Sequence, residues 1–295
     1  MLEFLFASTP LLYAGVFVLG ALIGSFLNVV ILRLPPMLEF DWRCQCRDLL
    51  ELAPEGRLAD AKLTEPPPGI VFSRSKCPSC GHAIRAWENI PLFSYAALGG
   101  RCSACKTRIS PRYPVVEILT AVLFVITIAH FGPTFQGLTA LLLTAFLIVM
   151  AGIDVDHQLL PDNLTLPLLW FGIVLAFWSV HVELTASVAG AVFGYLVLWS
   201  IYHLFRLLTG KEGMGYGDFK LLAALGAWMG WQMLPLIVLL SSVVCALFGL
   251  TLMGTGRLKR DKPMPFGPFI AAAGWIALIW GRDIIDFYMR SSAFG

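Results

Sequence analysis

Two aspartates stand where long apolar runs meet polar sequence, and they are the strongest candidates for chemistry in this chain. Asp218 leads into an apolar run that reaches Leu234, and Asp154 directly follows another, over residues 135–153. An ionisable residue at the end of a membrane helix is costly to place, so it marks a candidate functional site. Two carboxylates held close together share a proton, which makes one a base and the other an acid. Such a pair can direct a water molecule at a peptide carbonyl, which is the chemistry of an aspartic protease.

Three glycines precede Asp218 at alternate positions: Gly213, Gly215 and Gly217. Glycine permits positive φ and lets another chain approach the backbone closely. An exposed strand edge of this kind would hold an extended peptide by main-chain hydrogen bonds. An ordinary glycine-rich loop between two spans is an equal alternative. Lys220 is expected to extend to the membrane interface, and the alternative is that its charge opposes the rise in the pKa of the aspartate pair.

Four polar residues near these aspartates have simpler explanations. Asp156 lies two residues past Asp154 and so points to a different face of a helix. His157 is expected to be a polar anchor at the interface, with a proton shuttle as the alternative. Asp162 is expected to cap the next span, and Asp261, in a basic loop, to be solvated.

Four of the seven cysteines form two CxxC pairs separated by 21 residues: Cys77, Cys80, Cys102 and Cys105. Pairs at this spacing predict a zinc site with four thiolate ligands rather than a disulfide framework. A closed four-thiolate site has no open position for catalysis, so the zinc is expected to be structural. The remaining cysteines are expected to be unligated: Cys44, Cys46 and Cys245.

The composition is that of a membrane protein. Of the 295 residues, 58% are hydrophobic and 14% are charged, and the mean hydropathy is +0.77, whereas soluble domains carry about 25% charged residues. The first apolar run, over residues 11–32, is 22 residues long, which is enough to cross a bilayer. We expect Arg33 and the pair Pro35-Pro36 to end it, and a short amphipathic helix to follow over residues 38–53.

Seven more apolar runs of suitable length follow Pro114, over residues 115–131, 135–153, 164–182, 186–208, 218–234, 235–254 and 267–286. The predicted fold is an all-α membrane bundle of about eight transmembrane helices with a small cytoplasmic zinc-ribbon-like domain. The expected divisions are a first helix over residues 1–33, a cysteine-bearing domain over 34–113 and a membrane core over 114–295. Asn28, in the first helix, is expected to hydrogen-bond to a neighbouring helix.

Basic residues predict the orientation of the chain. Of the 21 Lys and Arg residues, 12 lie between Arg33 and Arg112, and others flank the glycine-rich stretch. Because cytoplasmic loops are rich in Lys and Arg, we expect the cysteine domain and both aspartates to face the cytoplasm. With eight spans, both termini then face outward.

The ordered motifs resemble those of type IV prepilin leader peptidases, which are membrane aspartic proteases of the GxGD type. The resemblance covers nearly the whole chain and rests on the two CxxC pairs and on Gly24-Ser-Phe-Leu-Asn-Val29, Arg33-Leu-Pro35, Glu88-Asn-Ile-Pro91, Arg112-Tyr-Pro114 with Glu117, Asp154-Val-Asp-His-Gln-Leu-Leu-Pro-Asp162, Gly215-Tyr-Gly-Asp218-Phe-Lys and Pro265-Phe-Gly-Pro268. It implies that Asp154 and Asp218 are the catalytic aspartates.

Members of this family with a long cysteine-bearing domain are bifunctional enzymes of the bacterial inner membrane. The resemblance implies that this protein removes the short basic leader of prepilins and secretion pseudopilins after a glycine. It also implies that the enzyme then methylates the new N-terminal amine with S-adenosylmethionine. By the same resemblance Gly100, just before the second CxxC pair, belongs to the methyl-transfer site, with a plain turn as the alternative.

Other classes of protein fit parts of the pattern. Paired aspartates within a membrane also occur in proton-coupled transporters and channels, but the sequence shows no internal repeat of the kind common in transporters. A non-catalytic scaffold for pilus assembly would use the zinc domain for docking. A different GxGD protease would lack the cysteine domain. No feature of the sequence points to a nucleic-acid partner.

Overall fold

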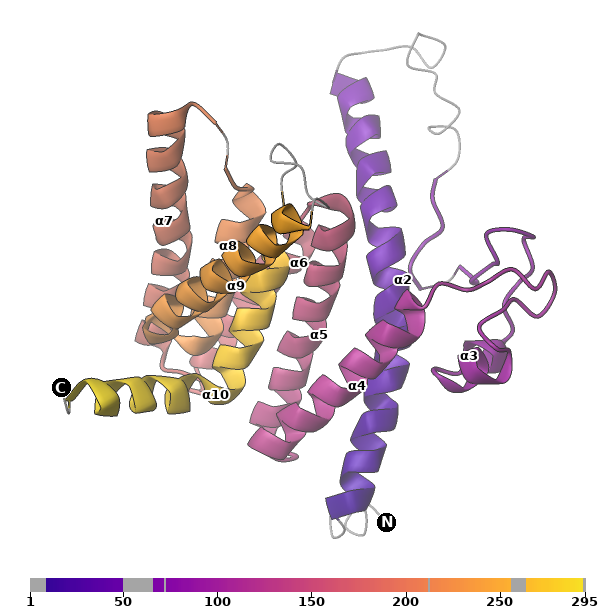
Figure 1. The fold of residues 1–295 in the computed structure, drawn as a ribbon, viewed down its shortest axis with the longest axis horizontal. Coiled ribbons are helices and arrows are strands. Elements are labelled where there is room, and N and C mark those ends of the chain that lie inside the picture. Colours follow the sequence, from indigo (N-terminus) through magenta and orange to yellow (C-terminus); the bar gives the residue numbers. More distant parts are fainter. Residues whose placement is uncertain (1–8, 50–65, 72, 212, 256–263, 294–295) are drawn as a thin grey trace. The chain divides into compact units, whose positions relative to one another are not determined.

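The computed structural model describes residues 9–49, 66–71, 73–211, 213–255 and 264–293. Within these ranges all regular structure is helical, apart from two isolated β-bridges (Figure 1). Six of the described helices are long and apolar enough to cross a membrane, which confirms the predicted all-α membrane architecture. The chain divides into two compact units, Met1–Ile126 and Thr127–Gly295.

The first unit holds α2 (Thr9–Leu49), the short helices η2 (Ala86–Asn89) and α3 (Phe93–Ala97), and most of α4 (Arg112–Phe131). Small residues let α2 and α4 approach closely, because a Cβ at Gly20 would lie 2.6 Å from Cα of Ala121. The side-chain amide of Asn28 donates to the carbonyl of Tyr113 at 3.1 Å, so the predicted link to a neighbouring helix is confirmed.

The prediction that the first helix ends at the Pro35-Pro36 pair is wrong, because α2 continues to Leu49. A proline removes one backbone donor, and membrane helices accept it where packing holds the flanking turns. Pro35 and Leu38 are both buried, three positions apart and so on one side of α2. The separate amphipathic helix predicted to follow is therefore the last part of α2, and its expected end at residue 53 lies outside the described residues.

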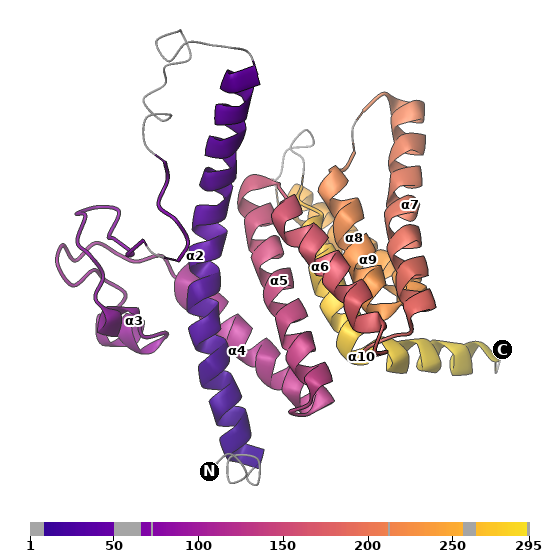
Figure 2. The ribbon, with the colours of Figure 1, turned by 180° about the vertical axis from the view of Figure 1, so that it is seen from behind.

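The second unit is built around a short central helix (Figure 2). Its elements are α5 (Phe135–His157), α6 (Asp162–Ala176), α7 (Leu184–Thr209), α8 (Tyr216–Met229), η3 (Trp231–Met233), α9 (Leu234–Gly254) and α10 (Gly267–Ala293). The central helix α8 contacts α6, α7, α9 and α10, and every residue from Leu221 to Gly230 is buried. At 14 residues α8 is about 21 Å long, which is shorter than a hydrocarbon core of about 30 Å. The predicted count of eight spans therefore stays a prediction.

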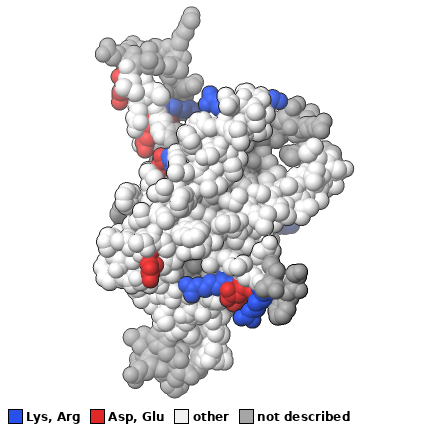
Figure 3. Space-filling view, turned by 90° about the vertical axis from the view of Figure 1, so that its left-hand side faces the viewer, with Lys and Arg blue, Asp and Glu red and all other residues white. Residues whose placement is uncertain are grey.

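The helices around α8 turn apolar side chains outward. Large exposed hydrophobic residues on α7 and α9 include Leu196, Leu204, Leu239 and Leu247. Charged side chains are sparse on the face seen in Figure 3. An apolar surface with few charges is what a helix bundle presents to hydrocarbon.

Candidate active site

Asp154 and Asp218 meet in the second unit. Asp154 lies in the last turn of α5 and Asp218 in the first turn of α8, and their side chains are buried, with 5% and 6% of their surface exposed. Leu160 packs beside both residues: a Cβ at Gly217, next to Asp218, would lie 2.7 Å from Leu160, and a Cβ at Gly267, whose amide contacts Asp154, would lie 3.1 Å from it. Two helix ends that are far apart in the sequence thus bring two carboxylates together.

The start of α10 holds Asp154 in place. The backbone amide of Gly267 donates to Oδ2 of Asp154 at 3.0 Å, and a Cβ at position 267 would lie 2.7 Å from the same oxygen. The N-terminus of a helix also carries partial positive charge, which suits a carboxylate. No separate role was predicted for Gly267 from the sequence. The feature from which this close backbone contact could have been predicted is a glycine that stands between two prolines at the start of an apolar run.

One of the glycines before Asp218 is packed tightly at the site. A Cβ at Gly217 would lie 2.7 Å from Cβ of Leu160, whereas a Cβ at Gly215 would lie at an ordinary 3.9 Å from Asp218. None of these three glycines adopts positive φ, and the chain is helical from Tyr216 onward. Gly215 is the N-cap of α8, and its carbonyl accepts from the amide of Asp218 at 3.2 Å. Gly215 is exposed and extended, with φ of −83° and ψ of 150°, so an extended edge that holds a peptide stays a prediction for the residues before α8.

Asp156 and His157 follow Asp154 without sharing its environment. Both side chains are exposed, whereas that of Asp154 is buried. For Asp156 this is expected, because residues two positions apart lie on different faces of a helix. Gln158 then ends α5 in a left-handed conformation with φ of 51°. The solvated position predicted for Asp261 lies outside the described residues.

The prediction that Asp162 caps the next span is wrong, whereas the interfacial position predicted for Lys220 stays a prediction. Pro161 occupies the N-cap of α6, and Asp162 is the first helical residue. Oδ1 of Asp162 accepts a hydrogen bond from Nζ of Lys220 at 2.6 Å. Lys220 therefore ties the start of α8 to the start of α6. Because both side chains remain partly exposed, water screens this ion pair and it stabilises the fold only weakly.

A group of aromatic residues beside Asp218 was missed by the sequence analysis. The ring of Phe219 contacts those of Tyr195, Tyr202 and Tyr216, with centroids 5.8, 5.6 and 5.2 Å away. Tyr195 and Tyr202 are seven positions apart on α7 and so lie on one face of that helix. This spacing is the feature of the sequence from which the aromatic group could have been predicted. The group packs α7 against the start of α8 and so fixes the backbone that carries Asp218.

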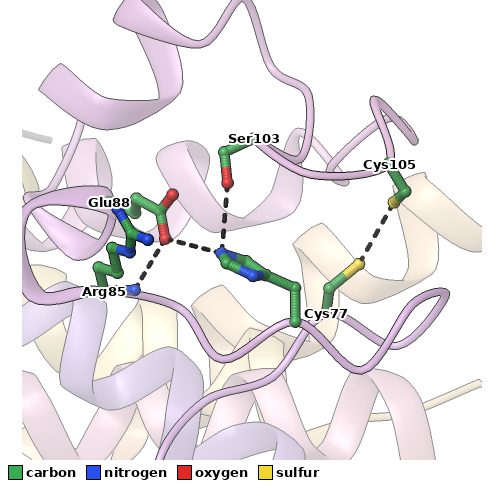
Figure 4. Close-up of polar contacts among 6 residues, drawn as sticks. Cys77, Arg85, Glu88, Ser103 and Cys105 are labelled. Carbon is green, nitrogen blue, oxygen red and sulfur yellow. Dashed lines mark hydrogen bonds and ion pairs between the residues drawn. The ribbon is translucent and has the colours of Figure 1, made fainter.

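The four cysteines of the two CxxC pairs converge in the first unit. Their ligand atoms all lie within 4.8 Å of one another, and Sγ of Cys77 lies 3.8 Å from Sγ of Cys105 (Figure 4). A tetrahedral zinc ion with Zn–S bonds of about 2.3 Å needs sulfur atoms about 3.8 Å apart, so the cluster fits this metal. The cysteines outside the cluster are Cys44, Cys46 and Cys245.

Each CxxC pair lies in the same kind of backbone turn. The amide of the first cysteine donates to the carbonyl five residues later, at 2.9 Å in both pairs. Gly81 and Lys106 occupy matching positions with φ of 71° and 59°. The hydroxyl and amide of Thr107 lower the pKa of Cys105 to about 6. This turn therefore favours the thiolate form of Cys105, which is the form that binds a metal.

Gly100 lies between the CxxC pairs in a left-handed turn with φ of 67°. Its amide donates to the carbonyl of Tyr95, and its carbonyl accepts from the amide of Ile109, both at 2.8 Å. A Cβ at Gly100 would lie 3.0 Å from Cζ and Oη of Tyr95. The glycine is therefore needed both for the turn and for the position of the Tyr95 ring.

Known proteins resemble this chain over its whole length. It matches the model of the bacterial peptidase A24 N-terminal domain over residues 18–131 and that of the type IV leader peptidase family over residues 141–250. Similar proteins from Pseudomonas aeruginosa, Stutzerimonas stutzeri and Aeromonas hydrophila are each named prepilin leader peptidase/N-methyltransferase. They are 52%, 53% and 52% identical, over 100%, 98% and 96% of this chain and 99%, 97% and 96% of their own lengths. No solved structure matches the chain. The chain therefore belongs to the type IV leader peptidase family.

Proposed function

We propose that this protein is a bifunctional membrane enzyme that cleaves the leader peptides of type IV prepilins and methylates the new N-terminal residue. Family membership supports both activities, because relatives that match over nearly their whole length carry both in their names. The observation that supports the protease most directly is the meeting of two buried carboxylates, Asp154 and Asp218, at two helix ends. A transporter or a non-catalytic scaffold has no comparable support.

Asp154 and Asp218 are the proposed catalytic pair. One carboxylate takes a proton from a water molecule whose oxygen attacks the scissile carbonyl carbon, while the other carboxyl group protonates the carbonyl oxygen. The tetrahedral intermediate then breaks the C–N bond after the glycine, and the leaving amine receives a proton from the pair. We assign the base to Asp154, because its Oδ2 accepts a hydrogen bond from the amide of Gly267, a geometry that suits an ionised carboxylate.

Methyl transfer is proposed to take place in the first unit, with S-adenosylmethionine as the donor. When bound, the donor would supply a methyl group to the neutral N-terminal amine: a C–N bond would form as the C–S bond of the sulfonium breaks, and the ammonium product would release a proton to water. A neutral amine is available because the pKa of an α-amino group is about 8. The four-cysteine cluster would hold one zinc ion with a structural role, since four thiolates leave no open position.

The enzyme is proposed to work in the bacterial inner membrane as a multi-pass protein. Six long apolar helices support this location. The concentration of Lys and Arg residues between Arg33 and Arg112 supports a cytoplasmic position for the cysteine-bearing segment and the aspartates. Secretion pseudopilins are proposed as further substrates, because the sequence resembles enzymes that process both kinds of precursor.

The protease assignment is tested with three asparagine variants of the purified protein and a prepilin substrate. We expect Asp154→Asn and Asp218→Asn each to lower the cleavage rate by about 100-fold or more, because general acid–base catalysis contributes on this order. Asp156→Asn, whose side chain is exposed, is the matched control and should retain most of the activity. An active Asp218→Asn enzyme would overturn the assignment, as would an inactive Asp156→Asn enzyme beside an active Asp154→Asn enzyme.

A further inference from the structure

The first unit contains a cavity of about 500 Å³ that the cleavage reaction does not use. Its walls come from α2, α3, α4 and the two CxxC turns, all within residues 25–117. Neither catalytic aspartate lines it. Sites for small molecules have volumes of roughly 300–1,000 Å³, so this cavity can hold a ligand the size of a substituted nucleoside.

Two carboxylates are built into the cavity wall. The side chain of Glu88 is 6% exposed; its Oε2 accepts from the amide of Arg85 at 2.8 Å and lies 3.4 Å from Nε2 of His82 (Figure 4). Glu117, on α4, is 7% exposed, and its Oε2 accepts from the amide of Leu92 at 2.9 Å. The Arg85 amide lowers the pKa of Glu88. Backbone amides thus fix both acidic groups where a ligand would meet them.

The Lys and Arg residues of the cavity are either exposed or bound to backbone carbonyls, and His82 lies beside Glu88. The guanidinium of Arg33 donates to the carbonyls of Gly69 and Ser73 at 2.7 and 2.8 Å. Lys76 and Arg108 also line the cavity, and both are exposed. A matching ligand therefore carries positive charge in its buried part and a negative group toward the solvent.

An aromatic wall completes the cavity. The ring of Tyr95 lines it, and the Tyr95 hydroxyl donates to the carbonyl of Ile109 at 3.4 Å. Gly100 does not line the cavity and lies against the same ring, where a Cβ would come within 3.0 Å. A fixed aromatic ring is a suitable surface for stacking a nucleobase. Gly100 is therefore a positioning residue that acts through Tyr95.

We propose that this cavity is the binding site of the methyl donor S-adenosylmethionine, with Glu88 and Glu117 facing its sulfonium and ammonium groups. The donor combines the required features, because it carries an adenine ring, two cationic groups and a carboxylate. Tyr95 stacks on the adenine, and Lys76 and Arg108 pair with the donor's carboxylate at the solvent side. The assignment rests on the N-methyltransferase activity proposed above and adds the place and the groups that bind the donor.

The zinc site and the cavity share a wall. Cys77, Cys102 and Ser103 line the cavity, and Oγ of Ser103 lies 3.4 Å from Nε2 of His82, which in turn contacts Glu88 (Figure 4). A metal that fixes the two CxxC turns therefore also fixes Glu88. This gives a structural zinc ion a direct part in shaping the donor site.

Equilibrium binding to the full-length protein in detergent tests the proposal. S-adenosylmethionine is compared with S-adenosylhomocysteine, which keeps the ammonium group but lacks the sulfonium charge. Glu88→Gln and Glu117→Gln retain an oxygen that can accept the backbone hydrogen bond, and each removes the charge. We expect each variant to bind S-adenosylmethionine at least about tenfold more weakly, since bonds between ionised groups are the strong ones. The variant that faces the sulfonium should bind S-adenosylhomocysteine almost normally.

Matched variants separate loss of the site from loss of the fold. Glu39→Gln, at an exposed position on α2, and Asp218→Asn should bind the donor as the unmodified protein does, and zinc content and thermal unfolding are measured for every variant. Normal donor binding by both cavity variants would overturn the proposal while leaving the methyltransferase intact, and would point to the prepilin N-terminus as the occupant. An unmodified protein that neither binds the donor nor transfers a methyl group would instead contradict the methyltransferase activity itself.

Discussion

Among single residues, the two glycines on either side of Tyr216 are not equivalent. In Gly217→Ala the new Cβ would lie 2.7 Å from Cβ of Leu160, whereas in Gly215→Ala it would make an ordinary contact with Asp218 at 3.9 Å. Overpacking costs about 1–3 kcal/mol, and here it displaces the helix end that carries Asp218. We expect Gly217→Ala to lower kcat/KM for prepilin cleavage by about tenfold or more and Gly215→Ala to keep most of it. Equal losses in both variants would contradict this account.

Gly99 and Gly100 form a similar matched pair in the first unit. Both have positive φ, at 60° and 67°, so alanine strains the backbone at either position by about 1 kcal/mol. A Cβ at Gly99 meets nothing within 4 Å, whereas one at Gly100 meets the Tyr95 ring. We expect Gly100→Ala to weaken donor binding and methyl transfer clearly more than Gly99→Ala, with cleavage normal in both. The measurement is methyl transfer to a synthetic mature N-terminus beside cleavage of the precursor.

The positions of Asp154 and Asp218 could be predicted from the sequence because each residue ends or begins an apolar run. The contacts that other helices make at and near these aspartates could not be predicted. The contact of Gly267 with Asp154 joins residues 113 positions apart, and that of Lys220 with Asp162 joins residues 58 positions apart. Both depend on how separate helices pack, and neither leaves a periodic pattern in the chain.

Among the elements, α7 and α8 make the closest contact, backbone against backbone. A Cβ at Gly190 would collide with the carbonyl oxygen of Gly226, and a Cβ at Gly226 with that of Gly190. The hydroxyl of Ser187 also donates to the carbonyl of Ala227 at 2.6 Å. Small residues that allow such approach drive association between membrane helices. The position of α8, and with it of Asp218, therefore depends on this crossing.

Gly226→Ala tests the crossing. The new methyl group would meet backbone atoms of α7, which cannot move aside as a flexible side chain can. We expect the midpoint of thermal unfolding to fall by about 5 °C or more, because overpacking costs about 1–3 kcal/mol and each kcal/mol shifts the midpoint by several degrees. Gly254→Ala on α9, where nothing lies within 4 Å, is the control and should leave the midpoint unchanged or slightly raised. Equal midpoints in the two variants would argue against the crossing.

The presence of the helices was easier to predict than the residues at which they end or the extent to which each helix is buried. Apolar runs located each long helix that the structure describes, because a membrane helix must satisfy its backbone polar groups internally and present apolar side chains to the lipid. The prolines in α2 were misleading, since packing of neighbouring residues such as Leu38 keeps the helix continuous. The central position of α8 could not be predicted from the sequence either. Its run reads like any other span in the sequence, and only the fold shows that the residues from Leu221 to Gly230 are buried on all sides.

In the molecule as a whole, the groups proposed for the two reactions belong to different compact units. The cysteine cluster, Gly100 and the 500 Å³ cavity lie in Met1–Ile126, while Asp154 and Asp218 lie in Thr127–Gly295. Methyl transfer to a freed amine requires no pair of carboxylates, and peptide cleavage requires no methyl donor. The two activities should therefore be separable by mutation in both directions.

The double variant Cys77→Ser with Cys102→Ser tests this separation together with the metal. Both cysteines contribute sulfur atoms to the cluster and surface to the cavity, and zinc binding supplies folding energy in small cysteine-rich units. We expect elemental analysis to find one zinc ion per chain in the unmodified protein and none in the variant. The variant should lose donor binding and methyl transfer but still cleave a prepilin, because Asp154 and Asp218 lie in the other unit.

Asp218→Asn should show the reverse, methylating a synthetic pre-cleaved pilin N-terminus without cleaving the precursor. Zinc retained by the double variant would contradict the four-cysteine site, and loss of both activities in either variant would show that the two units do not act independently.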